Sequence, residues 1–247
     1  MMKARKTSYR KYILISIVII LILLIAVFSF LRCFFIFLDG KLYRKDITVI
    51  RGVNVTSNNI REINLCTKLE ELDIWAANDN ILSEMKAFNS LADLLMVDAN
   101  LSEGGILRLN EMPQLNRMTF LESHIDLTRL NNKALTHLSI SLSDVSGIIG
   151  CASCSSLTEM VLQEVTIPDK IICTKNKEYL LKDSSDFSAL DNIKVLEIHD
   201  IDIEDISGFL EMDSLETLNV TQGTLSNNDY QILMEAGIII QEQSTES

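Results

Sequence analysis

Apolar residues recur in this chain at four fixed positions of a repeating unit, and this periodicity constrains the fold more than any other feature. Positions 1, 4, 6 and 11 of eight units are apolar at 31 of 32 sites, the exception being Asp79, although only 47% of all residues are hydrophobic. One such unit cannot bury its apolar face alone, whereas stacked units share a continuous core, so the pattern predicts a solenoid. The units begin at Ile50, Leu69, Leu91, Leu115, Leu135, Leu157, Ile193 and Leu215.

The pattern L-x-x-L-x-L, with another apolar residue five positions later, resembles the leucine-rich repeat. The clearest unit, 193–214, is apolar at positions 1, 4, 6, 11, 14, 17 and 20, and it resembles the 22-residue class of bacterial internalin-like proteins. The resemblance implies an α/β fold: a leucine-rich repeat solenoid (horseshoe) with a parallel concave sheet. Position 9, where the family usually has Asn or Cys, is Asn only at Asn58, so we expect an irregular ladder of hydrogen bonds in the turns.

The solenoid is expected to be one of several segments. A spacing of 36 residues between the unit starts Leu157 and Ile193 predicts an insertion, placed in the polar run 174–186 and expected to be a loop. The predicted segments are a basic cytoplasmic tail (1–12), a transmembrane signal anchor (13–38), a juxtamembrane joint and N-cap (39–49), eight repeats (50–225), and a C-terminal cap with a polar tail (226–247).

The stretch from Ile13 to Leu31 predicts the transmembrane helix. It contains 19 residues without a charge, enough at helical rise to cross about 30 Å of hydrocarbon. A cleaved secretory signal is the alternative, but its apolar region is shorter and ends in small residues. Here the bulky residues Phe28, Phe30 and Leu31 lie at the exit.

The orientation of this helix rests on charge. Five basic residues precede the apolar stretch and five follow it closely, so the positive-inside count is equal on the two sides. A short, strongly basic tail is costly to translocate, whereas a large following domain crosses largely regardless of its charge. We therefore expect the amino terminus inside the cell and the repeats outside.

The charge of the chain limits its partners. The formal net charge is -12, and the acidic excess lies after the apolar segment. Such a field repels phosphate backbones, so no nucleic-acid partner is expected.

No residue pattern indicates catalysis or a bound metal. Cys151 and Cys154 form a C-x-x-C, but they fall at positions 17 and 20, where the unit 193–214 has Phe209 and Met212. We interpret them as small buried apolar residues and predict no metal and no cofactor. The chain lacks the common nucleophile, phosphate-loop and metalloprotease motifs, so it is not expected to be an enzyme. An enzyme using the acidic concave face is a weaker alternative because nothing positions a nucleophile or base.

The resemblance places positions 3, 5, 7 and 8 of each strand on the concave face, where this family characteristically binds macromolecules. At position 7, Trp75, Val97 and Leu121 are expected to form an exposed column about 10 Å long. Around it lie Leu95, the acids Asp73 and Asp93, and the donors Arg117 and His137. The alternative is that loops cover this column, or that the assumed register is wrong by one residue.

The sequence therefore predicts a single-pass cell-membrane protein whose C-terminal domain is extracellular and binds a protein or other cell-surface ligand. The alternative is a scaffold that is tethered to the membrane, faces the cytosol and recruits intracellular proteins.

Overall fold

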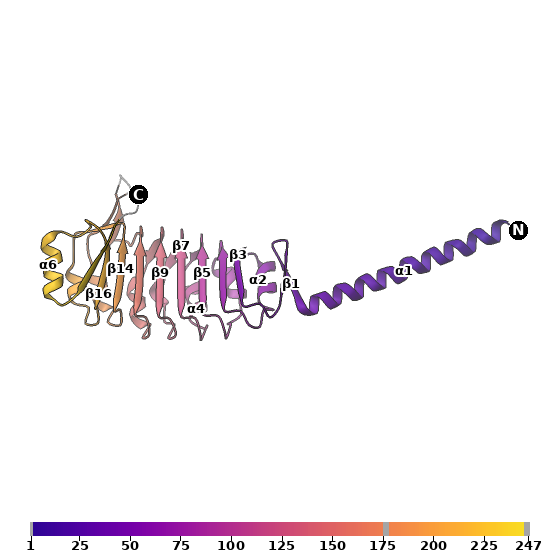
Figure 1. The fold of residues 1–247 in the computed structure, drawn as a ribbon, viewed down its shortest axis with the longest axis horizontal. Coiled ribbons are helices and arrows are strands. Elements are labelled where there is room, and N and C mark those ends of the chain that lie inside the picture. The colour runs from indigo at the N-terminus through magenta and orange to yellow at the C-terminus, as the bar shows by residue number, and fades with distance from the viewer. Residues whose placement is uncertain (1, 175–177, 245–247) are drawn as a thin grey trace. The chain divides into compact units, whose positions relative to one another are not determined.

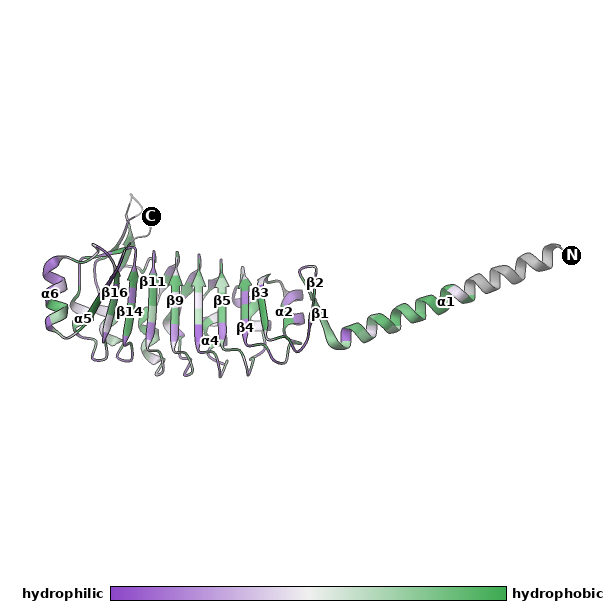
Figure 2. Ribbon diagram, viewed as in Figure 1, coloured by the Kyte–Doolittle hydropathy of each residue, from purple (hydrophilic) through white to green (hydrophobic). Residues whose placement is uncertain are grey.

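The computed structural model describes residues 2–174 and 178–244, with side chains from Ile15 onward. Two compact units divide the chain, Met1–Lys45 and Asp46–Ser247. The first contains helix α1 (Met2–Phe34), whose segment Ile15–Phe34 has a mean hydropathy of 3.0 and is unburied. Figure 2 shows this segment in green. It is long and apolar enough to cross a membrane, a test that a secretory signal near the amino terminus also passes.

Helix α1 is followed by a β-hairpin that the sequence analysis missed. Strand β1 (Phe35–Leu38), which was assigned to the anchor, pairs antiparallel with β2 (Lys41–Arg44) from the expected joint. The two connecting residues, Asp39 and Gly40, have φ values of 46° and 78°. Positive φ at both central residues is typical of the type I′ turn, whose twist matches that of a two-residue β-hairpin. Asp-Gly is a strong sequence signal for this turn.

The second unit is built on a sheet of nine parallel strands, drawn side by side in Figure 1. Side chains alternate along each strand, so positions 4 and 6 enter the core and positions 3, 5 and 7 point to the other side. We call that other side the sheet face. In spatial order the strands are β3 (Val49–Asn54), β4 (Glu71–Trp75), β5 (Asp93–Val97), β7 (Arg117–Leu121), β9 (His137–Ser141), β11 (Glu159–Gln163), β14 (Val195–His199), β16 (Thr217–Thr221) and β17 (Ile239–Gln243).

The register predicted for the second to eighth units is confirmed. Leu72 at position 4 aligns with Leu94 and then Met118, and the alignment continues through to Leu218. The first unit was placed wrongly, because Ile50 aligns with Leu72 and therefore occupies position 4 rather than position 1. A bulge follows, with Gly52 at a φ of 67°, and it brings Val53 opposite Ile74.

Short helical segments cover the core on the side opposite the sheet face. Thr56, Asn78, Ser102 and Ser226 cap four of them by accepting a backbone N–H bond, which satisfies donors that a helix start leaves free. Three of the described segments are tighter 3-10 turns, labelled η. The segments are α2 (Ser57–Ile63), α3 (Asp79–Glu84), α4 (Glu103–Leu109), η1 (Leu127–Arg129), η2 (Ile148–Ser153), η3 (Ser185–Ala189), α5 (Ser207–Leu210) and α6 (Asn227–Glu235).

Side-chain hydroxyl groups continue the ladder where position 9 lacks Asn. The buried Ser123 hydroxyl accepts a 3.0 Å hydrogen bond from Ala99 N–H and donates to the Leu121 carbonyl at 2.8 Å. Ser143 repeats the arrangement one unit later, accepting from Ser123 N–H at 3.0 Å. Each hydroxyl therefore joins the turns of neighbouring units, and the backbone polar groups there remain paired inside the protein.

The insertion forms a β-hairpin rather than the expected loop. Strand β12 (Ile171–Cys173) pairs antiparallel with β13 (Tyr179–Leu181), and β13 pairs in parallel with β15 (Ile201–Ile203). Leu181 aligns with Ile203, which is position 11 of the next unit, so the extra residues lie before Leu181 and not in 174–186 as a whole. Three residues of that range, 175–177, lie outside the described residues. A further small parallel sheet contains β6 (Asn100–Leu101), β8 (His124–Asp126) and β10 (Asp144–Ser146).

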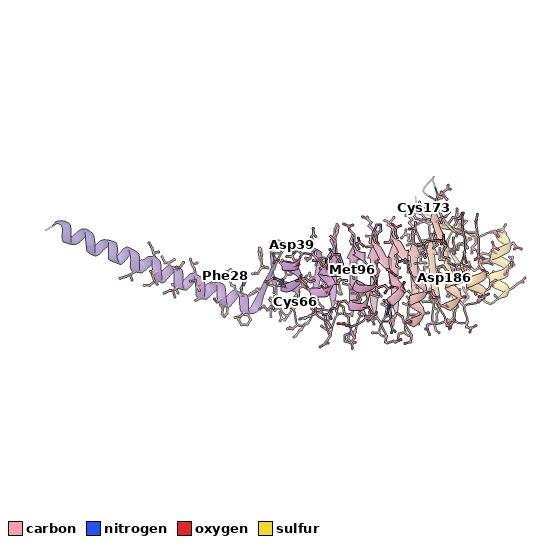
Figure 3. All side chains as sticks on the ribbon, turned by 180° about the vertical axis from the view of Figure 1, so that it is seen from behind. Phe28, Asp39, Cys66, Met96, Cys173 and Asp186 are labelled. Carbon is pink, nitrogen blue, oxygen red and sulfur yellow. The ribbon has the colours of Figure 1, made fainter. Side chains whose placement is uncertain are left out.

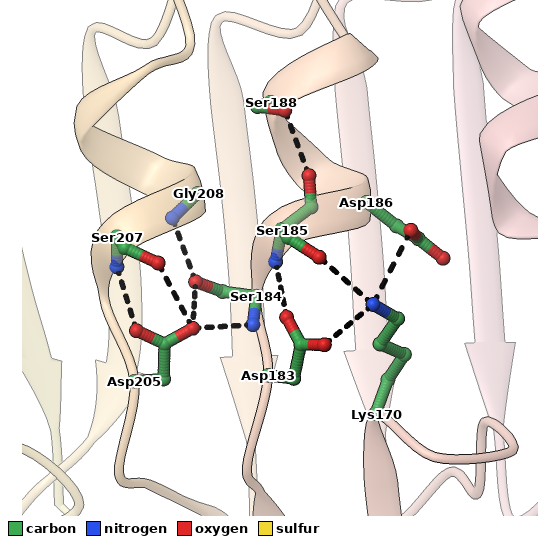
Figure 4. A network of polar contacts seen from close by, with 9 residues as sticks. All are labelled: Lys170, Asp183, Ser184, Ser185, Asp186, Ser188, Asp205, Ser207 and Gly208. Atoms are coloured by element: carbon green, nitrogen blue, oxygen red, sulfur yellow. Dashed lines mark hydrogen bonds and ion pairs between the residues drawn. The ribbon is translucent and has the colours of Figure 1, made fainter.

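Figure 4 shows a polar network that fixes the base of this hairpin. The Lys170 ammonium group, just before β12, lies 2.7 Å from the Asp183 carboxylate, just after β13, and donates to Ser185 Oγ at 2.8 Å. These contacts tie the start of the hairpin to its end. The hydrogen bonds from Lys170 and Ser185 lower the pKa of Asp183 to about 2.

The carboxyl-terminal end has the cap that the sequence indicates. Helix α6 begins after Ser226, and Gly237 follows its end with a φ of 90°, a conformation that favours glycine. Strand β17 then adds in parallel to β16.

The depressed pKa of Asp183 predicts a dependence of stability on acid. The folded state favours the ionised carboxylate, so this contribution is present above the unfolded pKa of about 3.9 and is lost as pH falls to about 2. Asp183→Asn should flatten the decline of the unfolding free energy across this window, measured by denaturant titration. Asp213→Asn, at an exposed residue outside the network, should keep the wild-type slope; equal slopes for all three proteins would contradict the assignment.

Candidate functional site

The sheet face carries three rows of side chains across β4, β5, β7 and β9. The strands are in register, so residues of equal position lie side by side, about 4.8 Å apart. The row at position 3 is Glu71, Asp93, Arg117 and His137, the row at position 5 is Asp73, Leu95, Thr119 and Ser139, and the row at position 7 is Trp75, Val97, Leu121 and Ser141. All eight residues predicted from the sequence therefore lie in these rows, on the same side of the sheet.

The row at position 3 is a line of ion pairs. Glu71 accepts from Arg51 at 2.7 Å, Asp93 Oδ1 lies 3.4 Å from Arg117 Nε, and His137 Nε2 lies 2.7 Å from the Glu159 carboxylate. These side chains are exposed to solvent in part or in full, so water screens the pairs and they contribute little to stability. Two adjacent acids, Glu71 and Asp93, are followed in the row by Arg117 and His137, and a ligand could match this order of charges.

Arg51 was missed as a member of this surface. The sequence register put it at position 2 of its unit, whereas the true alignment places it at the bulge beside Asp73. Gly52, two residues after Ile50, was the only signal of that bulge in the sequence. The Arg51 guanidinium gives the acidic end of the sheet face a positive partner.

Beside these pairs the sheet face is hollowed. A depression of about 260 Å³ is lined mainly by Arg51, Glu71, Asp73, Asp93 and Arg117. Burial raises the pKa of Asp73, the nearby Arg51 opposes this, and the charges of Glu71 and Asp93 add to the rise. The depression therefore holds acidic groups that a basic group of a ligand would relieve.

The apolar row differs from the sequence prediction at one residue. Trp75 is 49% exposed and Leu121 and Leu95 are half-buried, but Val97 is only 6% exposed. Val97 lies between Trp75 and Leu121 in the sheet, and these larger neighbours cover it. The prediction of an exposed column is therefore wrong at Val97, and the accessible anchors are Trp75 and the edge of Leu121.

The cysteines of the C-x-x-C are buried, as predicted. Cys151 is 2% exposed and Cys154 0%, and burial raises the pKa of both thiols. Cys66 is also buried, whereas Cys173 is exposed; Figure 3 labels both. Within the described residues no three His, Cys, Asp or Glu side chains are grouped to hold a metal ion.

This architecture defines the class of protein. In-register parallel strands, joined through short helical segments that cover one side of the sheet, form an internalin-like leucine-rich repeat fold. No family model matches the sequence. No curated protein matches it significantly.

The solved structures that are similar to this chain include two internalins. Internalin C2 of Listeria monocytogenes superposes with a TM-score of 0.51 and 14% sequence identity, over 83% of this chain and 86% of its own. An internalin of the same organism, InlF, gives a TM-score of 0.48 and 16% identity, over 84% of this chain and 66% of its own. At 14% identity, the similarity to internalin C2 shows only that the two chains share a fold.

Side chains at positions 6 and 7 point to opposite sides of the sheet, so alanine substitutions at Phe120 (position 6) and Trp75 (position 7) should affect stability differently. Phe120 is fully buried, so Phe120→Ala should lower the free energy of unfolding by about 3 to 5 kcal/mol. Trp75→Ala should change it by no more than about 0.5 kcal/mol, as at most surface sites. Thermal and denaturant unfolding measure both values, and a loss at Trp75 as large as at Phe120 would show that Trp75 packs into the core.

Proposed function

We propose that this chain is a membrane-anchored leucine-rich repeat protein whose sheet face binds a protein ligand. The observation that carries the proposal is the side chain of Trp75, 49% exposed on a rigid sheet and next in register to Val97 and Leu121. Tryptophan is the residue type most enriched at the centres of protein interfaces. Arg51, Asp73 and Arg117 provide charges at its border.

The proposed chemistry is recognition. An apolar group of the ligand would cover Trp75 and Leu121, which removes apolar surface from water. Basic groups of the ligand would lie near Asp73 and Glu71, and acidic groups near Arg117 and His137. Charged residues around an interface raise the association rate and fix the orientation of the ligand more than they raise the affinity.

Site-specific photo-crosslinking in living cells tests this face. A benzophenone amino acid replaces Trp75 in one full-length variant and Leu107 in the matched control, because Leu107 on α4 is 48% exposed on the opposite side of the solenoid. We expect a crosslinked protein from position 75 and not from 107. Capture from both positions alike, or from 107 alone, would contradict the proposal.

The captured protein then provides a quantitative test. Trp75→Ala should weaken its binding about 30-fold, the equivalent of about 2 kcal/mol at an interface anchor. Leu107→Ala should leave the dissociation constant unchanged. Equal effects of the two substitutions would remove Trp75 from the binding site.

We also propose that α1 is a single-pass anchor in the cell membrane and that residues 46–247 lie outside the cell. The support is the length and hydropathy of Ile15–Phe34 together with the basic residues before it. Protease treatment of intact cells should remove a carboxy-terminal tag. Protection of that tag would favour the alternative, a cytosol-facing scaffold that recruits intracellular proteins, for which the basic residues after the helix, Lys41, Arg44 and Lys45, are the supporting observation.

A further inference from the structure

A second hollow, of about 650 Å³, lies beside the inserted hairpin and away from the sheet face. Its floor comes from the small sheet β6, β8 and β10, and its side wall from β12 and the residues just before it. The volume is within the usual range of about 300 to 1,000 Å³ for ligand sites. Figure 3 labels Cys173 of β12, on the part of the chain that projects here.

Pro168 lines this hollow and ends a ladder of hydrogen bonds there. Thr166 continues the small sheet beyond β10, since Val145 N–H bonds the Thr166 carbonyl at 2.8 Å. The next bond of a parallel ladder would run from residue 168 to the Val145 carbonyl, but proline has no N–H to donate. The chain turns instead, and Ile167 pairs with Ile171. The Val145 carbonyl therefore lacks its ladder donor at a residue that lines the hollow.

Strand β12 also has an edge with which no strand of the described residues pairs. It is the outer strand of its sheet, in the order β12, β13, β15. Lys182 N–H bonds the Lys170 carbonyl and Thr174 N–H bonds the Glu178 carbonyl, so the alternation of an antiparallel ladder points the N–H and C=O of Cys173 away from β13. Cys173 lines the hollow whereas no residue of β13 does, so backbone groups are available there to an incoming chain.

The walls are apolar and the border is acidic. Ile125, Val145, Ile167 and Ile171 line the interior. Among the described residues, the border carries Asp126 and Asp144, the adjoining depression adds Glu122 and Glu164, and no lysine or arginine lines either depression. Hydrogen bonds from the Thr128 hydroxyl and N–H lower the pKa of Asp126, which keeps it ionised at neutral pH.

Within the part of the chain that the structure describes, His124 is the only side chain of this border that can carry a positive charge, and it already contacts an acid. Its Nε2 lies 2.9 Å from Asp144 Oδ2, and Asp144 also accepts a short hydrogen bond from the Thr166 hydroxyl. These contacts hold the Asp144 carboxylate in place. The base of the hairpin is held as well, by the Lys170 network of Figure 4.

We propose that this hollow binds an extended peptide segment of a partner protein, with aliphatic side chains for the floor and a lysine or arginine for the acidic border. Charge complementarity identifies the basic residue, and the unpaired groups of Val145 and Cys173 favour a peptide backbone over a small amine. The site uses none of the sheet-face residues and is independent of the function proposed above. The test of peptide binding in the hollow is therefore independent of the test of ligand binding at Trp75.

The exposed thiol of Cys173 reports occupancy. Full-length protein in detergent micelles is alkylated with iodoacetamide in the presence of capped heptapeptide pools, and the rate at each cysteine is followed by mass spectrometry. One pool alternates valine or isoleucine with lysine or arginine, and a matched pool has aspartate or glutamate at the basic positions. At about 1 mM, the basic pool should lower the alkylation rate of Cys173 roughly tenfold, while the acidic pool should leave that rate unchanged. The alkylation rate at Cys33, which lies near the end of α1 and outside the hollow, should be the same with both pools.

Variants and further probes make the result decisive. Asp126→Asn combined with Asp144→Asn should raise the half-protecting concentration about tenfold, whereas Asp213→Asn and Trp75→Ala should not change it. The buried Cys151 and Cys154 must stay unreactive in every variant, which shows that each is folded. The proposal is overturned by equal protection from both pools, by none from either, or by protection that the double variant retains. Equal protection by pentylamine would assign the hollow to small amines instead.

Discussion

The structure depends on one constraint: a unit of this chain can bury its apolar residues only between its two neighbours. Positions 4 and 6 of each strand enter a core that is closed by the next strand in register, so every unit inherits its orientation from the one before. The sheet face follows directly. Because the side chains of residues 72 and 74 must point inward, those of residues 71, 73 and 75 must point outward. Rows such as Trp75, Val97 and Leu121 therefore form on the sheet face even though apolar residues do not favour exposure.

The same constraint explains where the solenoid tolerates additional structure. The nine-stranded sheet pairs Glu159 with Val195 although the two lie 36 residues apart, so the insertion leaves the main ladder intact. The extra residues leave the solenoid after Ile167, where Pro168 interrupts only the small secondary ladder. Leu181 then restores position 11 before the next helical turn. An insertion at this corner adds a hairpin and a hollow at little cost to the core, since loops at such corners are bounded by water.

The two candidate surfaces differ in kind. The sheet face is a flat, charged platform with one large aromatic anchor, Trp75, and its depression is lined mostly by polar groups. The hollow beside β12 is larger, apolar within and acidic at its border. A flat platform suits a folded partner, whereas an apolar hollow with unpaired backbone groups suits an extended segment.

The sequence alone determined the solenoid, its register from the second unit onward and the inward direction of Phe120, because a repeated pattern of period two and the stacking of units admit one arrangement of faces. The Asp39–Gly40 hairpin was also readable from its turn residues, although we missed it. Only the tertiary structure decided the burial of Val97, which depends on the size of its neighbours across the sheet, and the placement of Arg51, which depends on a bulge that shifts the register of one strand. The hollow beside β12 likewise required three dimensions: it joins residues of several units around a proline whose missing N–H matters only once Val145 lies opposite. Periodicity fixes what repeats, and contacts between chain segments decide each departure from the repeat.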